Sequence, residues 1–352
     1  MTGCARESAW KANEAASADP DALEQRSPVA RANWTIARAG EEVYAFYGLG
    51  PGKTHADIAR DVHAYNLRTR KWRVAAEIPV AEGRLASVAI TIGGDIYLFG
   101  GYTVSPAGEE ASTPEVLRFD PETDRFERET TMPTPVDDSI ALPGRDRWII
   151  LVSGWHDTGN VADVQVYDTR TKAWTSGTPW PGAPVFGHAG GVVGDVLVAC
   201  DGVTAVKGED GRNRFSLTDS CWRGELDADK VGRIRWQALP PHPGAALYRA
   251  GAVGTRDGNA VVFAGGSTRA YNYDGIGYDG VPAEPSAMVV SYDLRCNAWR
   301  TPPPLVAAAM DFRGLIEDRG RFLLFAGMRR GQTVSADVIR FEVPSGIAPT
   351  CE

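Results

Sequence analysis

Residues 95–126 contain a pattern that organises the whole chain. They read Asp95-Ile-Tyr-Leu-Phe-Gly-Gly101, then, after a polar loop, Glu115-Val-Leu-Arg-Phe-Asp120, and six residues later Phe126. A short apolar run that ends in a glycine pair is typical of a strand followed by a tight turn, and the second run is typical of a neighbouring strand. The stretch therefore predicts a small β-sheet with an aromatic side chain on its outermost strand.

The same pattern recurs in five further copies, of which the first and fourth are degraded and the sixth lacks the final aromatic. In chain order the copies contain Val43–Gly48, Asp61–Asn66 and Trp72; Trp148–Gly154, Asp163–Asp168 and Trp174; Val196–Gly202, Cys221–Asp227 and Trp236; Ala260–Gly266, Met288–Asp293 and Trp299; and Phe322–Gly327 with Asp337–Phe341. A four-stranded sheet cannot bury both of its faces alone, so repeated sheets must pack against one another.

The repeat resembles the kelch repeat over residues 29–343. The resemblance implies an all-β, six-bladed kelch β-propeller with four-stranded antiparallel blades, formed by residues 28–352, with the repeated aromatics filling the wedges between blades. Residues 1–27 are expected to be an N-terminal tail with a possible closing strand. Because an open sheet edge invites misassociation, Trp10 is expected to supply the aromatic and the outer strand that the sixth copy lacks.

Composition limits the function classes. The chain is 43% hydrophobic and 23% charged, with 39 Gly and 23 Pro among 352 residues, which indicates a folded chain rich in turns. Acidic residues exceed basic residues by 45 to 37, so no basic face for a nucleic acid is expected. No apolar run approaches the length of a membrane helix, so no transmembrane segment is expected.

The five cysteines leave several alternatives open. Met1-Thr2-Gly3-Cys4 is similar to the end of a bacterial lipoprotein signal, which makes Cys4 a possible lipid anchor, but Cys4 could instead pair with Cys351. Cys200 and Cys221 fall on adjacent strands and either form a disulfide or remain buried thiols. Cys296 has no obvious mate.

Ionisable residues gather in the loops that enter each blade. These loops and the loops after each glycine pair are expected to surround the central channel on one face, the default ligand site of such a ring. Four arginines at nearly equivalent positions are expected to converge on an anion. The expected binding residues in the entering loops are Arg31, Arg84, Asp137, Asp138, His188, Tyr248, Arg249, Asp311 and Arg313.

The loops after the glycine pairs are longer and more individual. Blade three offers Trp155 and His156, and blade four has an insertion between Asp201 and Ser220. Blade five has the stretch Arg269-Ala-Tyr-Asn-Tyr-Asp-Gly-Ile-Gly-Tyr278. Tyrosines flanked by glycine in a long loop offer a flat ring and a hydroxyl to a sugar, so Arg269, Tyr271 and Tyr273 are predicted to bind ligand, unless this loop only packs on the rim.

Some of these stretches resemble one kelch branch, the bacterial N-acetylneuraminate epimerases, which are periplasmic sialic acid mutarotases. The similar stretches are Phe263–Arg269, Gly48–Gly50 and the run from Val196 to Arg214. The resemblance implies that Asp201 stands where the family has a catalytic glutamate, and that Arg214 or Arg212 stands near its assisting arginine. Aspartate is one methylene shorter than glutamate, which puts the proton transfer in doubt.

The resemblance implies a sugar-acid anomerase that opens and recloses a hemiketal by acid/base chemistry and needs no cofactor. The competing interpretation is a non-catalytic kelch propeller that binds a glycan or an acidic peptide through the same residues. A periplasmic or lipid-anchored location is expected. Copper oxidase chemistry is disfavoured because the five histidines are scattered without metal-ligand spacing, so no metal site is predicted.

Overall fold

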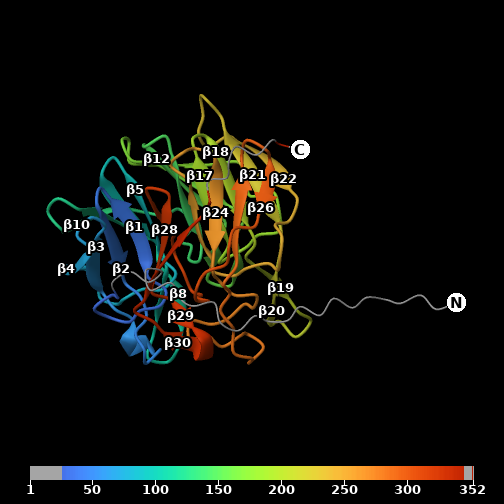
Figure 1. Ribbon diagram of the computed structural model, residues 1–352. Helices are drawn as coiled ribbons and strands as arrows, with labels where there is room; N and C mark the ends of the chain where they lie inside the picture. Colours follow the sequence, from blue (N-terminus) through green and yellow to red (C-terminus); the bar gives the residue numbers. More distant parts are fainter. Residues whose placement is uncertain (1–25, 345–350, 352) are drawn as a thin grey trace.

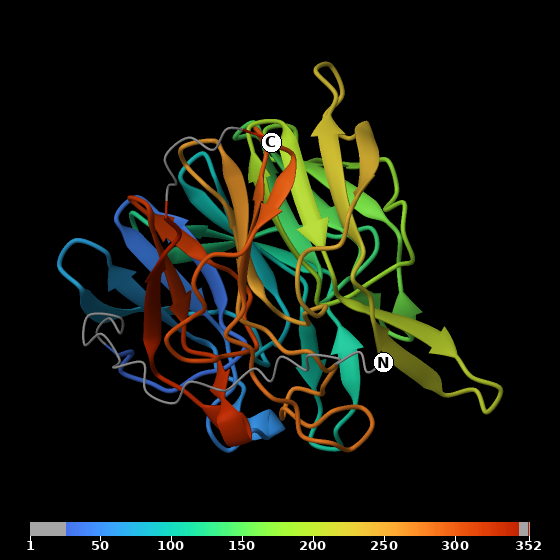
Figure 2. The same cartoon turned by 45° about the vertical axis from the view of Figure 1, so that its right-hand side comes forward.

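The computed structural model describes residues 26–344 and 351. It is a ring of antiparallel sheets in which the first strands of the blades surround the axis and the later strands of each blade lie farther out (Figures 1 and 2). Blades 1 to 3 contain β1 (Thr35–Ala39), β2 (Glu42–Phe46), β3 (Asp61–Asn66) and β4 (Lys71–Glu77); β5 (Val88–Ile92), β6 (Asp95–Phe99), β9 (Glu115–Asp120) and β10 (Arg125–Thr131); and β11 (Ile140–Gly144), β12 (Trp148–Val152), β15 (Val164–Asp168) and β16 (Ala173–Ser176).

Blades 4 to 6 complete the ring, so the predicted six-bladed propeller is confirmed. They contain β17 (Ala189–Val193), β18 (Val196–Cys200), β21 (Cys221–Leu226) and β22 (Ile234–Leu239); β23 (Gly251–Gly254), β24 (Ala260–Ala264), β25 (Val289–Asp293) and β26 (Ala298–Arg300); and β27 (Ile316–Asp318), β28 (Arg321–Phe325) and β31 (Val338–Glu342). The helices of the described residues are the single 3-10 turns η2 (His55–Asp57) and η3 (Arg330–Gln332), and neither could span a membrane.

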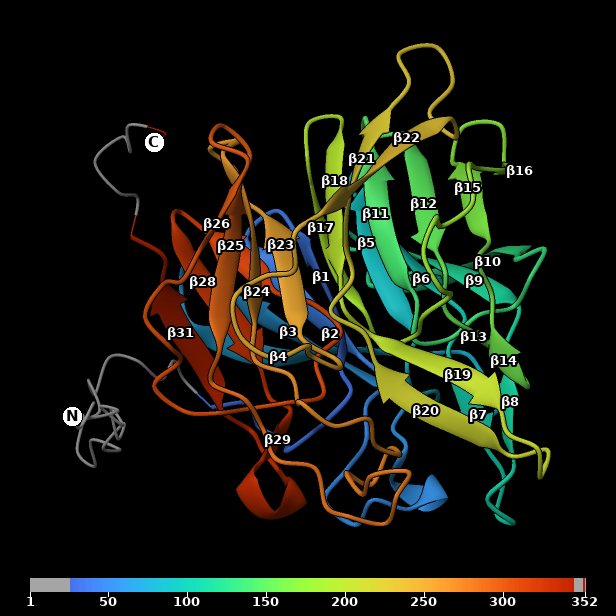
Figure 3. The same ribbon diagram turned by 90° about the vertical axis from the view of Figure 1, so that its right-hand side faces the viewer.

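Extra hairpins follow the second strand of four blades. They are β7 (Tyr102–Val104) with β8 (Glu110–Ser112), β13 (Trp155–His156) with β14 (Gly159–Asn160), β19 (Val203–Lys207) with β20 (Asn213–Leu217), and β29 (Met328–Arg329) with β30 (Thr333–Val334). Figure 3 shows β7, β8, β19, β20 and β29 beyond the same end of the blades. This end is called the hairpin face below.

Each pair of neighbouring blades encloses its own apolar core. The repeated aromatics lie in these wedges, as predicted: Trp174 packs on Tyr167 with ring centroids 4.9 Å apart, and Trp299 packs on Tyr292 at 5.0 Å. Trp72 of blade 1 also contacts Phe325 of blade 6, at 5.9 Å. The aromatic of the outer strand thus contacts the neighbouring blade as well as its own, which explains its fixed offset in the repeat.

Blade six has three strands among the described residues, and the edge of β31 has no strand beside it there. The backbone N–H of Ser27 donates to the carbonyl of Ala336 at 2.8 Å, as that of Ile78 does to Arg60 in blade 1 and that of Met132 to Pro114 in blade 2. Ser27 therefore occupies the place where other blades leave their fourth strand. Trp10, predicted to lie on the closing strand, is outside the described residues.

Two disulfides join the described cysteines. Cys200 of β18 and Cys221 of β21 are bonded, which confirms the predicted clip on blade four. Cys296, which has no obvious mate in the sequence, lies in the turn between β25 and β26 and is bonded to Cys351. This bond contradicts the alternative in which Cys351 pairs with Cys4. The fold brings the chain end next to that turn across 55 residues, which no local spacing reveals. Cys4, a possible lipid anchor, lies outside the described residues.

Candidate functional site

The two predicted sets of loops meet on the hairpin face. In every blade a residue of the entering loop forms an isolated antiparallel bridge with a residue just after the second strand. The bridges are Ala32 with Leu49, Leu85 with Tyr102, Asp137 with Trp155, Phe186 with Val203, Tyr248 with Ser267, and Met310 with Met328. The bridges hold both sets of loops around the axis at one level.

The residue after each bridge turns the chain through a left-handed conformation. These residues are Asn33, Ala86, Asp138, Gly187, Arg249 and Asp311, with φ between 50° and 71°. Hydrogen bonds link them from blade to blade: the N–H groups of Asp138, Gly187 and Arg249 donate to the preceding ring carbonyl at 3.1, 2.7 and 2.8 Å. The circuit closes through Asn33, whose N–H donates to Asp311 and whose side-chain oxygen accepts from Ala86. We call these six residues the axial ring.

The axial ring contains a buried ion network. Arg249, which is 2% exposed, donates to Asp138 at 2.6 Å and to Asp311 at 3.1 Å, while Arg313 also pairs with Asp138. Burial alone would raise the pKa of Asp138, but Arg249 and Arg313 outweigh burial and hold this pKa below its ordinary value. The guanidinium charges here are neutralised by carboxylates of the protein itself.

The four arginines do not converge, contrary to the expectation. Arg31 pairs with Asp61 at 3.4 Å and Arg84 with Glu115 at 2.6 Å, each reaching the first residue of the third strand of its own blade. Arg31 and Arg84 stand two residues before the axial-ring position, whereas Arg249 occupies that position itself and Arg313 follows it by two. Near-equivalence in sequence is not enough, because the left-handed residue of the axial ring turns the chain, so side chains before, at and after it point in different directions.

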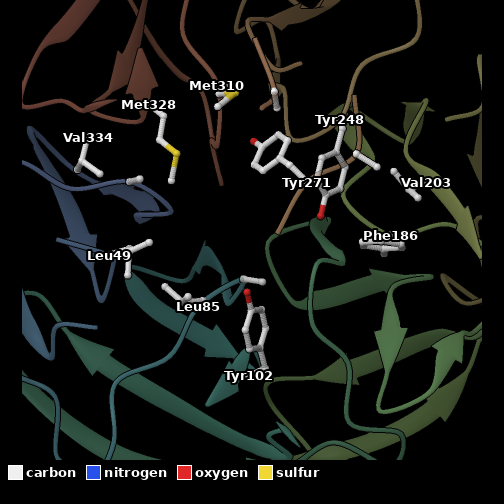
Figure 4. Close-up of a cluster of buried hydrophobic side chains, with 14 of the residues drawn as sticks. Leu49, Leu85, Tyr102, Phe186, Val203, Tyr248, Tyr271, Met310, Met328 and Val334 are labelled. Atoms are coloured by element: carbon white, nitrogen blue, oxygen red, sulfur yellow. The ribbon is translucent and has the colours of Figure 1, made fainter. Parts of the chain in front are cut away.

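The axis on this face is covered by apolar side chains. The buried cluster includes Leu85, Tyr102, Phe186, Tyr248 and Met310, and Figure 4 shows these side chains surrounding the axis. The ring of Tyr271 packs edge-on against Tyr248, with centroids 4.9 Å apart, and is fully buried.

Residues 267–285, called the cap loop below, bring Tyr271 across the face from blade five. The carbonyl of Asp274 accepts a hydrogen bond from Lys53 of blade 1 at 2.8 Å, and that of Ala283 accepts one from Gln332 of blade 6 at 2.8 Å. Arg269 is bonded to Asp279 within the same loop. The cap loop therefore covers the axial mouth on this face, while a cavity of about 320 Å³ lined by the innermost strands of all six blades remains along the axis.

A cavity of about 110 Å³ remains beside the axis, between the cap loop and the hairpins of blades 2, 3 and 4. It is lined by Tyr102, Glu110, Asp137, Asp138, Trp155, Phe186, Phe215, Arg249, Asn272, Tyr273 and Tyr278. Five of these were predicted to bind ligand: Asp137, Asp138, Trp155, Arg249 and Tyr273. We call this cavity the side pocket.

One wall of the side pocket is aromatic. Phe215 of β20 stacks on Tyr278 of the cap loop with ring centroids 4.0 Å apart, and Trp155 lies 5.4 Å from Phe186 and 5.9 Å from Phe215. Tyr278 keeps 39% of its surface exposed. Three separate blades thus supply one apolar wall that remains open to solvent at its rim.

The other wall is acidic. Asp137 is 4% exposed, and its Oδ2 accepts a hydrogen bond from the hydroxyl of Ser112 at 2.6 Å. Burial raises the pKa of Asp137 well above its ordinary value, and the neighbouring Asp138 carboxylate raises it further. Burial also raises the pKa of Glu110 on β8. The pKa of Asp137 is therefore raised and that of Asp138 lowered, although both side chains line one pocket.

Comparison with known proteins agrees with this architecture. A family model described as the kelch motif matches residues 83–133, which contain all four strands of blade 2, and the same unit recurs around the ring.

The chain is a six-bladed β-propeller whose second blade matches the kelch motif.

Kelch-like protein terF of Aspergillus terreus is 28% identical to this propeller over 254 residues, which is 66% of this chain and 52% of that protein. Kelch-like protein 36 of Bos taurus is 21% identical over 304 residues, 85% of this chain and 44% of that protein. The chain thus spans about half the length of the curated relatives it matches. The solved structure of YjhT superposes with a TM-score of 0.74 at 16% identity, covering 92% of this chain and 98% of that one, and this likeness concerns the fold.

The predicted catalytic pair of this propeller is separated. Asp201 is 3% exposed and accepts hydrogen bonds from the ring of His242, at 2.9 and 3.0 Å, and from the N–H of Leu247 at 3.0 Å. Arg214 lies on β20, where it pairs with the exposed Asp210 at 2.8 Å. Asp201 occupies the place of the first glycine of the repeat and points between blades four and five, so this geometry does not support an acid/base pair of Asp201 and Arg214.

Two predicted histidines also lie outside the side pocket. His188 is buried between blades three and four, 5.8 Å from Trp180, and burial lowers its pKa to about 4. His156 lies next to Trp155 but faces Asp157 at 3.7 Å. No group of three metal-ligating side chains is found among residues 26–344 and 351.

Sequence reasoning missed Tyr102, Glu110, Phe186, Phe215, Asn272 and Tyr278 as site residues. Part of the signal was present in the kelch repeat, because Tyr102 follows the glycine pair of blade 2 as Trp155 follows Ser153-Gly154 in blade 3. Phe215 and Tyr278 lie inside the two insertions that were predicted to face a ligand. Which of their residues point inward depends on the pairing of β19 with β20 and on the folding of the cap loop.

Proposed function

We propose that this propeller is a non-catalytic binding protein and that the side pocket holds the ring of a carbohydrate. The observation that carries the proposal is the pairing of an aromatic wall, formed by Trp155, Phe215 and Tyr278, with a polar wall that includes Asp137 and Asn272. Sugars present an apolar ring face and an edge of hydroxyl groups. A pocket with one stacking wall and one hydrogen-bonding wall matches both.

The charge of the side pocket favours a glycan over a sugar acid or an acidic peptide. Arg249 is the one cationic lining residue, and it is already bonded to Asp138 and Asp311. Binding a carboxylate there would require Arg249 to leave buried partners, at a cost typical of broken buried ion pairs. The relatives with curated names are kelch-like proteins, which also supports a binding role.

The test is a titration with a panel of mono- and oligosaccharides, followed by NMR or calorimetry. Phe215→Ala should weaken the binding of any sugar that binds by at least tenfold, because the packing of the sugar ring on the Phe215 side chain is lost. Val206→Ala is the matched control: Val206 lies on the same hairpin, is 65% exposed and does not line the pocket. Equal effects of the two substitutions, or no hit in the panel, would contradict the proposal.

A second candidate is interconversion of sugar anomers, favoured by the opposite shifts of Asp137 and Asp138. A carboxyl whose pKa is raised can act as the acid, and one whose pKa is lowered can act as the base. Hydrogen bonds from Tyr248, Arg249 and Arg313 occupy Asp138, which favours binding over catalysis. NMR exchange spectroscopy on N-acetylneuraminate and neutral sugars tests this candidate: faster exchange that Asp137→Asn abolishes would support it.

A periplasmic or lipid-anchored location remains part of the proposal. The two disulfides favour an oxidising compartment, since such bonds are rare in reducing ones. Cys4 would be the attachment point of a lipid. Fractionation of the native protein, together with mass spectrometry of its N-terminal peptide, tests both statements.

A further inference from the structure

We propose that the ring bound in the side pocket carries a protonated amine, so that the ligand class is amino sugars. This inference rests on the proposed carbohydrate-binding function and adds the charge of the ligand to it. It follows from the acidic side chains that face the pocket without a cationic partner.

Two carboxyl groups that line the pocket have no arginine partner. Both guanidinium groups nearby, Arg249 and Arg313, are paired with Asp138, and Arg249 also with Asp311. Asp137 and Glu110 line the same pocket, and neither forms a salt bridge within residues 26–344. The unbalanced charge of this wall is negative, and the buried carboxyl group of Asp137 needs a cation or a proton.

A second, independent observation points to a polar ligand at this place. Tyr102 is 5% exposed and lines the pocket, yet its hydroxyl has no hydrogen-bond partner among the described residues. Figure 4 shows this hydroxyl directed toward the middle of the cluster, on the side of Tyr248. The Tyr102 hydroxyl is therefore available to form a hydrogen bond with a ligand atom in the pocket.

The aromatic wall suits the same ligand. An ammonium group near the faces of Trp155 and Tyr273 would gain cation–π attraction, and the ring carbons would pack on Phe215. Asp137, on the opposite wall, would accept hydrogen bonds from the ammonium through the carboxylate oxygen that Ser112 does not use. A carboxylate at this place would instead face Asp137, Asp138 and Glu110.

Ligand charge and protonation are coupled in this arrangement. In the free protein, burial and the Asp138 charge raise the pKa of Asp137, with Glu110 raising it and Arg313 lowering it to a smaller extent. An incoming ammonium supplies the missing opposite charge and lowers that pKa. Binding of an amino sugar should therefore release a proton from Asp137 to solvent, whereas binding of the parent hexose should not.

The experiment is calorimetry of the full-length protein with glucosamine, galactosamine and mannosamine, each against its parent hexose, at pH 6.5 in two buffers of different ionisation enthalpy. At least one hexosamine should bind ten or more times tighter than its hexose, with a buffer-dependent heat that reports the released proton. Glu110→Gln and Asp137→Asn should each reduce the preference to threefold or less. Glu109→Gln, an exposed neighbour outside the pocket, is the control and should keep it.

Two outcomes separate this inference from the proposed function. If hexoses bind as tightly as hexosamines, the inference is wrong and the carbohydrate site stands. If neither class binds, both are wrong. Asp137→Asn keeps an acceptor for Ser112, and Glu110 lies at the exposed rim, so at least Glu110→Gln is expected to fold and to give an answer.

Discussion

Asp137 and Asp138 are adjacent in the chain but perform different tasks. Asp138 has a φ of 50°, and its side chain enters the ion network of the axial ring, whereas Asp137 turns to the side pocket and meets Ser112. One carboxyl is surrounded by guanidinium groups and the other by aromatic rings and a second carboxyl, so their pKa values move in opposite directions. The direction of one backbone turn therefore separates a structural aspartate from a ligand-facing one.

The pairing of Asp201 with His242 yields a prediction about stability. Burial alone would lower the pKa of His242, but Asp201 outweighs burial and raises it above its ordinary value. The contribution of this histidine is therefore fully present below about pH 6.5 and is lost as pH rises through its folded pKa. Asp201→Asn should lower the free energy of unfolding by about 3 kcal/mol at pH 6 and by less at pH 9.

Chemical denaturation of wild type and Asp201→Asn at the two pH values measures this difference. Ligand affinity at pH 7 serves as the control, because Asp201 does not line the side pocket and affinity should not change. A loss of sugar turnover at unchanged stability would instead restore the catalytic role that the resemblance to the epimerases implies for Asp201.

At the scale of elements, the Cys200–Cys221 disulfide closes the segment that contains the β19–β20 hairpin. The two cysteines lie at the base of this hairpin, 21 residues apart, and the hairpin places Phe215 in the aromatic wall. Replacing both cysteines by serine should cost about 3 kcal/mol of stability, from loop entropy regained by the unfolded chain. It should also weaken ligand binding severalfold, because the wall is less firmly held.

The matched control is the double serine variant of Cys296 and Cys351, which opens the other disulfide, whose cysteines do not line the side pocket. Its denaturation midpoint should fall under non-reducing conditions, but its ligand affinity should equal that of wild type. Equal loss of affinity in both variants would show that Cys200–Cys221 has no particular role in the pocket.

The open edge of β31 carries a second prediction at this scale. Six residues separate the outer-strand aromatic from the exit residue in blades 1, 2, 3 and 5, as from Trp72 to Ile78 and from Trp299 to Leu305. Ser27 has the contact of an exit residue, and the residue six positions before it in the sequence is Asp21. We therefore expect the residues directly before Ser27 to cover the edge.

Two truncations distinguish these possibilities by thermal unfolding. Removal of residues 1–25 should lower Tm by about 5 °C or more, because it removes the cover of the edge. Removal of residues 1–12 deletes Trp10 but keeps the segment next to Ser27, and it should leave Tm within about 1 °C. An equal decrease in Tm for the two truncations would favour Trp10 as the closing residue.

At the scale of the molecule, the axial ring ties all six blades together, and Gly187 is its most crowded member. A Cβ at Gly187 would lie 2.0 Å from the ring of Tyr248, and its φ of 62° disfavours any other residue. Gly194 has a similar φ of 58° but nothing within 4 Å of its Cβ position. Gly194→Ala should cost about 1 kcal/mol from backbone strain, and Gly187→Ala about 3 kcal/mol or more because packing is also lost.

Equilibrium unfolding in denaturant measures both values, and the difference between the variants isolates the packing of the ring. Both should unfold in a single transition if the ring makes the propeller one cooperative unit. Similar losses for the two variants would mean that the left-handed backbone alone, and not the contact with Tyr248, makes Gly187 important.

Several parts of the site were within reach of the sequence. Trp155 was predicted because it lies in the loop after the second strand of blade three, and Tyr273 because tyrosines flanked by glycine in a long loop are poor core material; both line the pocket. The four arginines were not predictable in the same way, since their partners lie far along the chain: Arg249 bonds to Asp138 across 111 residues and to Asp311 across 62. A guanidinium group can serve an anionic ligand or a carboxylate of the protein, and composition does not distinguish the two.

The sequence by itself determined the number of blades, the strands within them and the wedge positions of the repeated aromatics, because each of these follows from short-range periodicity and from a contact that every repeat must make. Only the tertiary structure decided where a ligand can enter. The cap loop of blade five crosses to blades 1 and 6, covers the axial mouth and leaves an acidic, aromatic pocket beside it. Such contacts join loops from different repeats, and the individual repeats do not encode them.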